Sequence, residues 1–258
     1  MKPINPKQTS EKIVAFIQQS FAKSGFTNGV IALSGGVDSA TSCALAVRAI
    51  GVENVYPILL PYGSLSTQAT IDAVAVLEKL GIPSFHVTRI DIKPVVDPIT
   101  VKEPGMDAVR RGNLMARARM MVLFDQAKKR RALVVGTENR TEHLLGYFTR
   151  FGDEASDIEP IRDLYKTQVY DLAKYLNLPE AVLSKAPTAG LWDGQTDEGE
   201  FGFTYTEADN VLSLTVDEKK SAAEIVASGF RADTVDRVLA RVSQNEFKHR
   251  LPMLPADR

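Results

Sequence analysis

The sequence of 258 residues has a single cysteine, Cys43, and only three histidines. One thiol excludes a disulfide framework and a multi-thiolate zinc site, and it is typical of a cytoplasmic protein. Long apolar runs are also missing. None approaches the roughly 18 residues of a membrane span, and the amino-terminal MKPINPKQTS lacks the apolar core of a signal peptide. These absences exclude a disulfide-rich secreted protein and predict no membrane association.

Excess charge of either sign is absent as well. The 31 basic and 32 acidic residues give a net charge of −1, so no overall field attracts nucleic acid or a membrane surface. The basic run Lys128–Arg131 is interpreted as a solvated helix end. Hydrophobic residues make up 44% of the chain and charged residues 24%, which is ordinary for a globular protein with a full core.

Strand signals alternate with helix signals through the first 140 residues. This order predicts an α/β fold with a doubly wound, mainly parallel sheet flanked by helices, which is Rossmann-like. Ligands bind such sheets at the carboxyl ends of the strands. The predicted strands are 29–33, 54–62, 84–90 and 132–137, and the predicted helices are 37–50, 66–81, 112–129 and one from about Thr9.

The pattern changes after about residue 160. A proline-punctuated stretch at 93–105 has no assigned element. An amphipathic helix is predicted at 163–177, followed by a long segment at 186–209 and two helices from about Ala222 and Ala232. We expect one domain over residues 1–258, with a nucleotide-binding core at about 9–160, a helical and lid part at about 161–258, and no glutaminase domain.

The stretch IALSGGVDSA, residues 31–40, carries the first chemical signal. It follows a predicted buried strand and opens a helix, so Gly35 and Gly36 are expected to allow positive φ and close approach to a ligand. The first N–H groups of a helix hold phosphate well, and Ser34 and Ser39 add hydroxyl donors. The carboxylate of Asp38 fits a phosphate site if a divalent cation lies between them. The alternative is a tight turn in which Asp38 is a helix N-terminal charge.

The motif SGGVDS resembles the loop of the ATP pyrophosphatases, which cleave ATP between its α and β phosphates. Three further stretches are similar to the ammonia-dependent NAD synthetases: GNLMARARM, GTENRTEHLLGYFTRFGDEASDIEPIRDLYKTQV and PTAGLWDGQTDEGEFGF. The resemblance covers about residues 9–252. It implies ATP-dependent amidation of deamido-NAD with ammonia through an acyl-adenylate, the last step of NAD biosynthesis. It also implies Mg²⁺, ATP as co-substrate and a homodimer with the dinucleotide near the subunit interface.

The resemblance assigns roles to individual positions. Catalytic roles fall on Asp38, Lys166 and Thr188, and metal binding on Asp38 and Glu142. The deamido-NAD contacts are Arg117, Arg150, Asp157 and Lys248. The ATP contacts are Ala32, Leu33, Ser34, Gly35, Gly36, Val37, Asp38, Ser39, Thr137, Lys166 and Thr188. Without their motifs, Glu142 and Lys166 would be interpreted as solvated helix residues, and Arg119 beside Arg117 as structural.

The sequence departs from the family at three places. Arg150 replaces the usual lysine, which keeps the charge but changes its geometry. Gly190 stands where aspartate is common, and the tail differs at Phe247 and His249. The segment 186–203 is expected to be a lid that is poorly ordered without ligands, with Trp192 and Phe203 sealing the site.

Two other classes of function stay open at this stage. One is another ATP pyrophosphatase, although thiolases need additional cysteines and GMP synthetases carry a different dimerising tail. The other is a non-catalytic nucleotide-binding module, which would not need Asp38, Glu142, Lys166 and Thr188 together. Cys43 falls on the Ala-rich face of a predicted helix, where a small apolar residue is expected.

Overall fold

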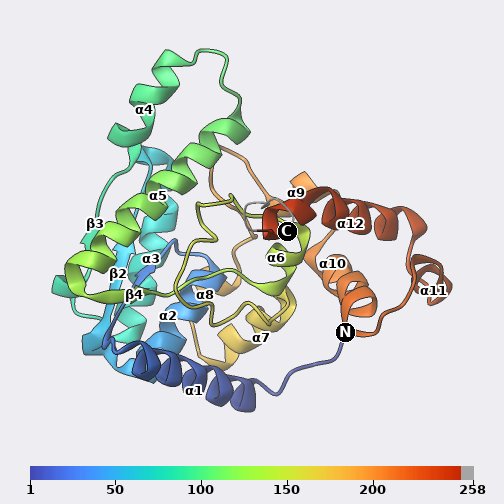
Figure 1. Cartoon of the computed structure of the whole chain (residues 1–258), viewed down its shortest axis with the longest axis horizontal. Coiled ribbons are helices and arrows are strands. Elements are labelled where there is room, and N and C mark those ends of the chain that lie inside the picture. Colours follow the sequence, from blue (N-terminus) through green and yellow to red (C-terminus); the bar gives the residue numbers. More distant parts are fainter. Residues whose placement is uncertain (251–258) are drawn as a thin grey trace, which may run out of the picture.

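Four parallel strands form the central sheet, in the order β3-β2-β1-β4 (Figure 1). The structure is a computed structural model that describes residues 1–250. Helices cover both faces of the sheet, and most residues of its first, second and fourth strands are buried. The strands are β1 (Asn28–Ala32), β2 (Val55–Leu59), β3 (Thr88–Arg89) and β4 (Ala132–Val134).

Twelve α-helices are present in the described residues. Those of the α/β part are α1 (Pro6–Ser24), α2 (Val37–Ile50), α3 (Thr67–Leu80), α4 (Lys93–Lys102), α5 (Ala108–Arg130), α7 (Lys166–Tyr175) and α8 (Glu180–Leu183). The remainder are α6 (Arg140–Leu145), α9 (Asp197–Phe201), α10 (Tyr205–Leu212), α11 (Ala222–Ala227) and α12 (Ala232–Asn245).

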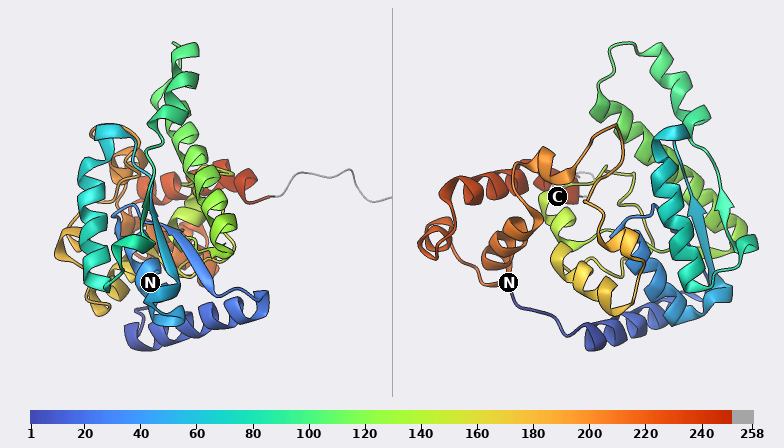
Figure 2. Two further views of the ribbon diagram at one scale, coloured as in Figure 1. Left: turned by 90° about the vertical axis from the view of Figure 1, so that its left-hand side faces the viewer. Right: turned by 180° about the vertical axis from the view of Figure 1, so that it is seen from behind.

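Alternation along the strands divides the helices between the two faces of the sheet. Ile31 and Leu59 point into a core built with α1, α2, α3, α7 and α8. Their neighbours Val30 and Ile58 point into a second core built with α4 and α5. This period-two pattern is what a strand buried on both faces requires. Figure 2 shows α4 and the start of α5 projecting from the body of the protein.

A third core lies in the carboxyl-terminal helical part, beside the sheet (Figure 1). It joins α6, α10, α11 and α12 around buried side chains such as Leu145, Val211 and Val235. The boundary near residue 160 is not a break in packing. Helix α7 packs on the first core, and the amino group of Met1 donates to Asn210 Oδ1 on α10 at 3.0 Å. The two parts therefore interlock.

The predicted fold class is confirmed, and most element positions agree with the sequence. Helix α2 has the predicted bounds, since Gly36 precedes it and Gly51 follows it. Helix α3 ends at Gly81 in the left-handed conformation, as the glycine stop predicted. The third strand was predicted too long: Ser84–His86 form a 3₁₀ turn, and β3 has two residues.

The prolines at 93–105 did not prevent a helix. Helix α4 accepts Pro94 in its first turn, where no N–H partner is needed, and contains Pro98. Contacts with Tyr62, whose hydroxyl donates to Asp97 Oδ1 at 2.5 Å, stabilise it. The segment 186–209 was predicted as a loop, but it contains α9 and the start of α10.

No helix in residues 1–250 is both long and apolar enough to span a membrane.

Candidate active site

A cavity of about 450 Å³ opens at the carboxyl ends of β1, β2 and β4. This is the edge at which parallel α/β sheets bind ligands. Most residues assigned to ATP and metal binding line it. They are Ala32, Leu33, Ser34, Gly36, Val37, Asp38, Ser39, Thr137, Glu142, Lys166 and Thr188.

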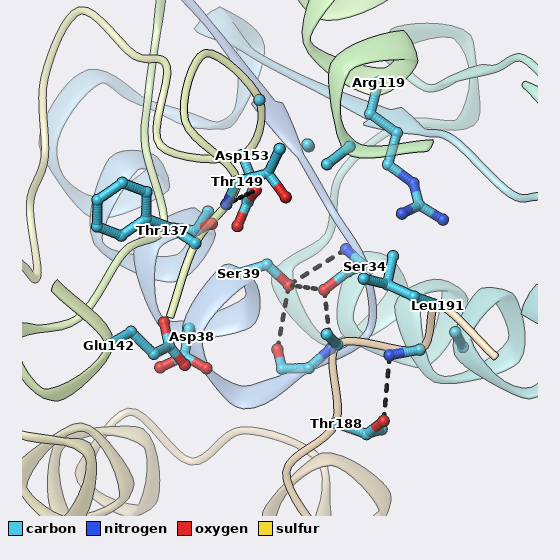
Figure 3. Close-up of a pocket in the computed structure, with 18 of the residues that line it drawn as sticks. Ser34, Asp38, Ser39, Arg119, Thr137, Glu142, Thr149, Asp153, Thr188 and Leu191 are labelled. Atoms are coloured by element: carbon cyan, nitrogen blue, oxygen red, sulfur yellow. Dashed lines mark hydrogen bonds between the residues drawn. The ribbon is translucent and has the colours of Figure 1, made fainter. Parts of the chain in front are cut away.

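The loop after β1 is held in a tight turn by its own serines (Figure 3). The hydroxyls of Ser34 and Ser39 are 3.0 Å apart, and Ser39 Oγ donates to the Gly36 carbonyl at 3.1 Å. Gly35 has φ +77°, and a Cβ there would lie 2.3 Å from the Ala69 carbonyl of α3. Gly36 is extended at φ −87°, so the expectation of positive φ is confirmed at Gly35 and wrong at Gly36. Gly35 does not line the cavity; it lets the loop approach α3.

The amino terminus of α2 faces the same cavity. Val37, Asp38 and Ser39 form its first turn, and no side chain in the described chain caps this end. The N–H groups of a first helical turn lack partners within the helix, and the helix dipole adds positive potential there. This end of α2 is therefore suited to an anion such as phosphate.

Three charged side chains from three helices meet beside this loop. Lys166 Nζ, from the first residue of α7, lies 2.6 Å from Asp38 Oδ2 and 3.0 Å from Glu142 Oε1. Asn139, the N-cap of α6, donates to Asp38 Oδ1 at 2.9 Å and accepts from the N–H of Glu142 at 3.0 Å. The Tyr205 ring lies 4.9 Å from Lys166 Nζ. The Lys166 ammonium is thus held between the carboxylates of Asp38 and Glu142.

The protonation of this cluster follows from burial and charge. Burial opposes the charge on Lys166, but Asp38 and Glu142 outweigh it and raise the pKa of the ammonium above its usual range. Burial raises the pKa of Glu142, and the nearby Lys166 opposes that rise. The 3.0 Å contact favours a charged Lys166 held between its two acceptors.

The donor set of this cluster fits Mg²⁺. Mg²⁺ prefers hard oxygen ligands and keeps several waters, so one or two carboxylates plus substrate phosphates are enough to hold it. Asp38 and Glu142 supply those carboxylates, from α2 and α6. Within residues 1–250, no group of three or more His, Cys, Asp or Glu side chains is placed to hold a metal.

The segment after α8 closes one side of the cavity with a folded turn. Thr188 Oγ1 donates to the Gln195 carbonyl at 2.8 Å and accepts from the Gly190 N–H at 3.1 Å. The N–H of Ala189 donates to the buried Asp197 at 3.0 Å. Asp197 in turn accepts from the hydroxyl of Tyr205 at 2.9 Å. The segment is thereby connected to the tyrosine that lies against Lys166.

Sequence reasoning missed several groups in the cavity wall. Arg119 donates from Nε to the Leu60 carbonyl at 3.1 Å, and its guanidinium faces the cavity (Figure 3). Asp153 lines the cavity within a matched motif and had no assigned role. Outside the cavity wall, Tyr205 lies against Lys166 and had no motif, but the T-x-x-E capping box at 204–207 could have predicted the start of its helix.

The positions assigned to the dinucleotide do not gather in one place. Lys248 lines the cavity and donates to the carbonyls of Gly146 and Phe148 at 2.7 and 3.0 Å. Arg117 and Arg150 lie outside the cavity. Arg117 donates from Nε to the backbone carbonyl of Arg150 at 3.3 Å. Asp157 also lies outside it, and its Oδ2 accepts from the Val134 N–H at 2.7 Å. The geometry gives Asp157 a structural contact with β4.

Comparisons with known proteins agree with this geometry. Residues 9–252 match the family model described as NAD synthase. The chain is 43% identical over 251 residues to the NH(3)-dependent NAD(+) synthetase of Fusobacterium nucleatum, with 97% of this chain and 96% of that protein covered. It is similar to the structure of NMN synthetase from Francisella tularensis, with a TM-score of 0.86, 35% identity and coverage of 98% and 100%. It is also similar to the NH3-dependent NAD synthetase from Campylobacter jejuni in complex with the nitrate ion, with a TM-score of 0.81, 31% identity and the same coverage.

Proposed function

The chain belongs to the NAD synthase family, and we propose from this premise how its cavity carries out the family reaction. The enzyme catalyses the ATP-dependent amidation of deamido-NAD to NAD, the last step of NAD biosynthesis. It is a ligase that binds ATP and deamido-NAD.

The reaction runs in two steps. A carboxylate oxygen of the nicotinate attacks the α-phosphorus of ATP, the bond to the β-phosphate oxygen breaks, and pyrophosphate leaves with its electron pair. Ammonia then attacks the carboxyl carbon of the acyl-adenylate, loses a proton, and expels AMP. No protein nucleophile is needed, so catalysis consists of positioning the reactants and stabilising charge on phosphorus and on the carboxyl carbon.

Different residues of the cavity bind the phosphates, the metal ion and the rest of ATP. The first turn of α2 and the hydroxyls of Ser34 and Ser39 hold the phosphates that leave as pyrophosphate. Lys166 supplies a positive charge to the same phosphates. Asp38 and Glu142 would hold Mg²⁺, which neutralises phosphate charge when it is bound. Thr137 and Thr188, on opposite sides of the cavity in Figure 3, supply further polar contacts to ATP.

One observation carries the proposal: the Asp38–Lys166–Glu142 cluster lies beside an uncapped helix amino terminus at the carboxyl edge of the sheet. The test is product analysis after incubation with deamido-NAD, ATP, Mg²⁺ and ammonium. We expect NAD, AMP and pyrophosphate in equal amounts. Formation of ADP and phosphate instead would reject the assignment at its base.

Nicotinate mononucleotide is a second candidate acceptor. The NMN synthetase from Francisella tularensis has a similar structure, and the nicotinate carboxylate to be activated is the same group in both acceptors. In addition, Arg117, Arg150 and Asp157 lie outside the cavity of a single chain. Measuring kcat/KM for both acceptors in one assay decides between them: the proposal requires the higher value for deamido-NAD.

We propose that a second copy of the chain completes the dinucleotide site. Arg117 and the exposed Met121 lie one turn apart on α5, and Phe151 beside Arg150 is 54% exposed. A positive and apolar surface of this kind suits a partner subunit and an anionic substrate held at their interface. Sedimentation equilibrium tests this: the mass should be twice that of one chain.

We further propose that the chain works as one domain in the cytoplasm. The contacts of Met1 with α10 and of α7 with the sheet support a single cooperative unit. The single thiol, Cys43, is buried and unpaired, as is common in a reducing compartment.

Free ammonia is the nitrogen donor in this proposal. Cys43 is fully buried, and burial raises the pKa of its thiol to about 12, so it cannot serve as a nucleophilic thiolate for glutamine. Cys43→Ser should therefore keep most of the ammonia-dependent kcat, although the added hydroxyl costs some stability. Supplying glutamine as sole nitrogen donor is the check: NAD formation with stoichiometric glutamate would contradict the proposal. Because NH₃ reacts, the apparent KM for total ammonium should fall as the pH rises.

The segment 186–203 stays a predicted lid. Most of its turn is held by local hydrogen bonds of Thr188, Gln195 and Asp197, and contacts of this kind open at low cost in free energy. We expect limited proteolysis to cut this segment readily in the free enzyme and slowly with ATP and deamido-NAD bound. Equal cleavage rates in both states would count against a lid.

A further inference from the structure

Asp209, on α10 in the carboxyl-terminal part, makes hydrogen bonds to the two helices that carry Glu142 and Lys166. Its side chain is fully buried. Oδ1 accepts from the hydroxyl of Thr141 on α6 at 2.5 Å. Oδ2 accepts from both the N–H and the hydroxyl of Thr167 on α7, at 2.8 and 2.7 Å. One carboxylate thus satisfies three donors from two helices.

These donors are immediate neighbours of the active-site cluster. Thr141 precedes Glu142, and Thr167 follows Lys166. The hydroxyl of Thr141 also accepts the N–H of Lys166 at 2.9 Å, so the amino-terminal end of α7 is connected through Thr141 to Asp209. Hydrogen bonds connect Lys166 to Thr141, Thr141 to Asp209, and Asp209 to Thr167. Because Lys166 and Thr167 are adjacent in sequence, these bonds form a closed ring that holds the starts of α6 and α7 together.

The position of α10 is itself fixed. Its apolar residues Tyr205, Ala208, Val211 and Leu212 are buried in the third core. Burial raises the pKa of Asp209, and its three hydrogen bonds oppose that rise. A carboxylate that is buried with this set of donors has little freedom to move, because each unsatisfied partner would be left in an apolar surrounding.

We propose that Asp209 is a positioning residue for the amidation reaction: it sets the separation of Lys166 and Glu142 by hydrogen bonding to the helices that carry them. The inference rests on the proposed function. It assigns the carboxyl-terminal helices a role in catalysis although Asp209 touches neither the cavity nor a reactant. A misplacement of about 1 Å can cost about 100-fold in rate, so a small shift of α7 relative to α6 is enough.

The test compares Asp209→Asn with Val211→Ala. Asparagine keeps the size of the side chain but replaces one acceptor with a donor, so at least one of the three donors from Thr141 and Thr167 loses its acceptor. Val211→Ala is the matched control, since it weakens the same helix in the same core without touching any of these bonds. Thr167→Val is a milder variant that removes one hydroxyl donor if Asp209→Asn does not fold.

The measurements are kcat, the KM values for ATP and deamido-NAD, and Tm. For Asp209→Asn we expect kcat to fall at least about tenfold, with both KM values changed less than about threefold, because a positioning contact acts mainly on the transition state. Thr167→Val should lower kcat by a few-fold in the same manner. Val211→Ala should lower Tm with kcat within about twofold of wild type.

A kcat for Asp209→Asn within twofold of that for Val211→Ala would overturn the proposal, as would an unchanged kcat for Thr167→Val if only that variant folds. The wild-type enzyme, assayed alongside, separates this outcome from failure of the proposed function. If the wild-type enzyme forms NAD and the variants behave as the control, only the role of Asp209 is rejected.

Discussion

Replacing Asp38 with Asn, or Glu142 with Gln, is expected to lower kcat at least about 100-fold at saturating ATP. Both substitutions keep the size of the side chain and remove its negative charge. A metal ion held by these carboxylates would supply several kcal/mol of charge stabilisation, and 100-fold corresponds to about 2.7 kcal/mol. An amide is a poor ligand for Mg²⁺ in place of a carboxylate, so the loss should exceed that of an ordinary polar contact.

The fold should survive both changes. Asn139 is fully buried and its Nδ2 donates to Asp38 Oδ1, a bond that an asparagine oxygen can still accept. Circular dichroism spectra that match the wild type check this, whereas Tm should fall because buried Lys166 loses one of its two carboxylate partners. Asp171→Asn is the matched control, because Asp171 is exposed on α7, the helix of Lys166. A near-normal rate for either active-site variant at saturating Mg²⁺ would reject that residue as a ligand.

Lys166→Met should lower kcat by a similar factor and also destabilise the protein at neutral pH. The substitution removes the charge that faces the phosphates and leaves Asp38 and Glu142 without the cation between them. Lys166→Arg should recover part of the activity, since it keeps the charge but with a planar geometry. Lys174→Met, an exposed change on the same helix, should leave both kcat and Tm nearly unchanged.

The destabilisation has a predictable pH dependence. Burial raises the pKa of Glu142, and Lys166 opposes that rise, so in Lys166→Met the folded-state pKa lies further above the unfolded value. Such a folded state binds more protons than the unfolded state, and its stability increases as the pH falls. The difference in Tm between wild type and Lys166→Met should therefore shrink as the pH is lowered from about 10 towards the wild-type pKa of Glu142, which burial raises to about 8. A difference that grows over this range would contradict the charge arrangement.

Local sequence signals predicted the α/β part well because residues that start or stop helices mark the ends of its elements. Gly36 and Gly51 delimit α2, and Gly81 ends α3. The helix α4 was missed because two prolines suggest a break, whereas Pro94 falls in the first turn and Tyr62 stabilises the helix through a tertiary hydrogen bond. Only the folded structure shows that bond.

The active-site residues likewise fall into a group that the sequence predicted and a group that it did not. The loop at 34–39, Glu142 and Lys166 belong to contiguous motifs, and the structure brings them together. Tyr205 lies 63 residues from Glu142 in sequence, and Asp209 lies 68 residues from Thr141. Their roles depend on contacts between elements far apart in the chain, for which a single sequence carries no local pattern. The assignments of Arg117, Arg150 and Asp157 stay predictions.

If ATP activates the nicotinate carboxylate as an acyl-adenylate, one oxygen of that carboxylate must be transferred to AMP, and isotope labelling can follow it. Deamido-NAD labelled with ¹⁸O at both oxygens of the nicotinate carboxylate would be incubated with ATP, Mg²⁺ and ammonium, and the products analysed by mass spectrometry. The oxygen that attacks the α-phosphorus stays on phosphorus when ammonia expels AMP. We expect one ¹⁸O atom in each AMP, one in the amide of NAD, and none in pyrophosphate. Unlabelled AMP, or label in pyrophosphate or phosphate, would contradict it.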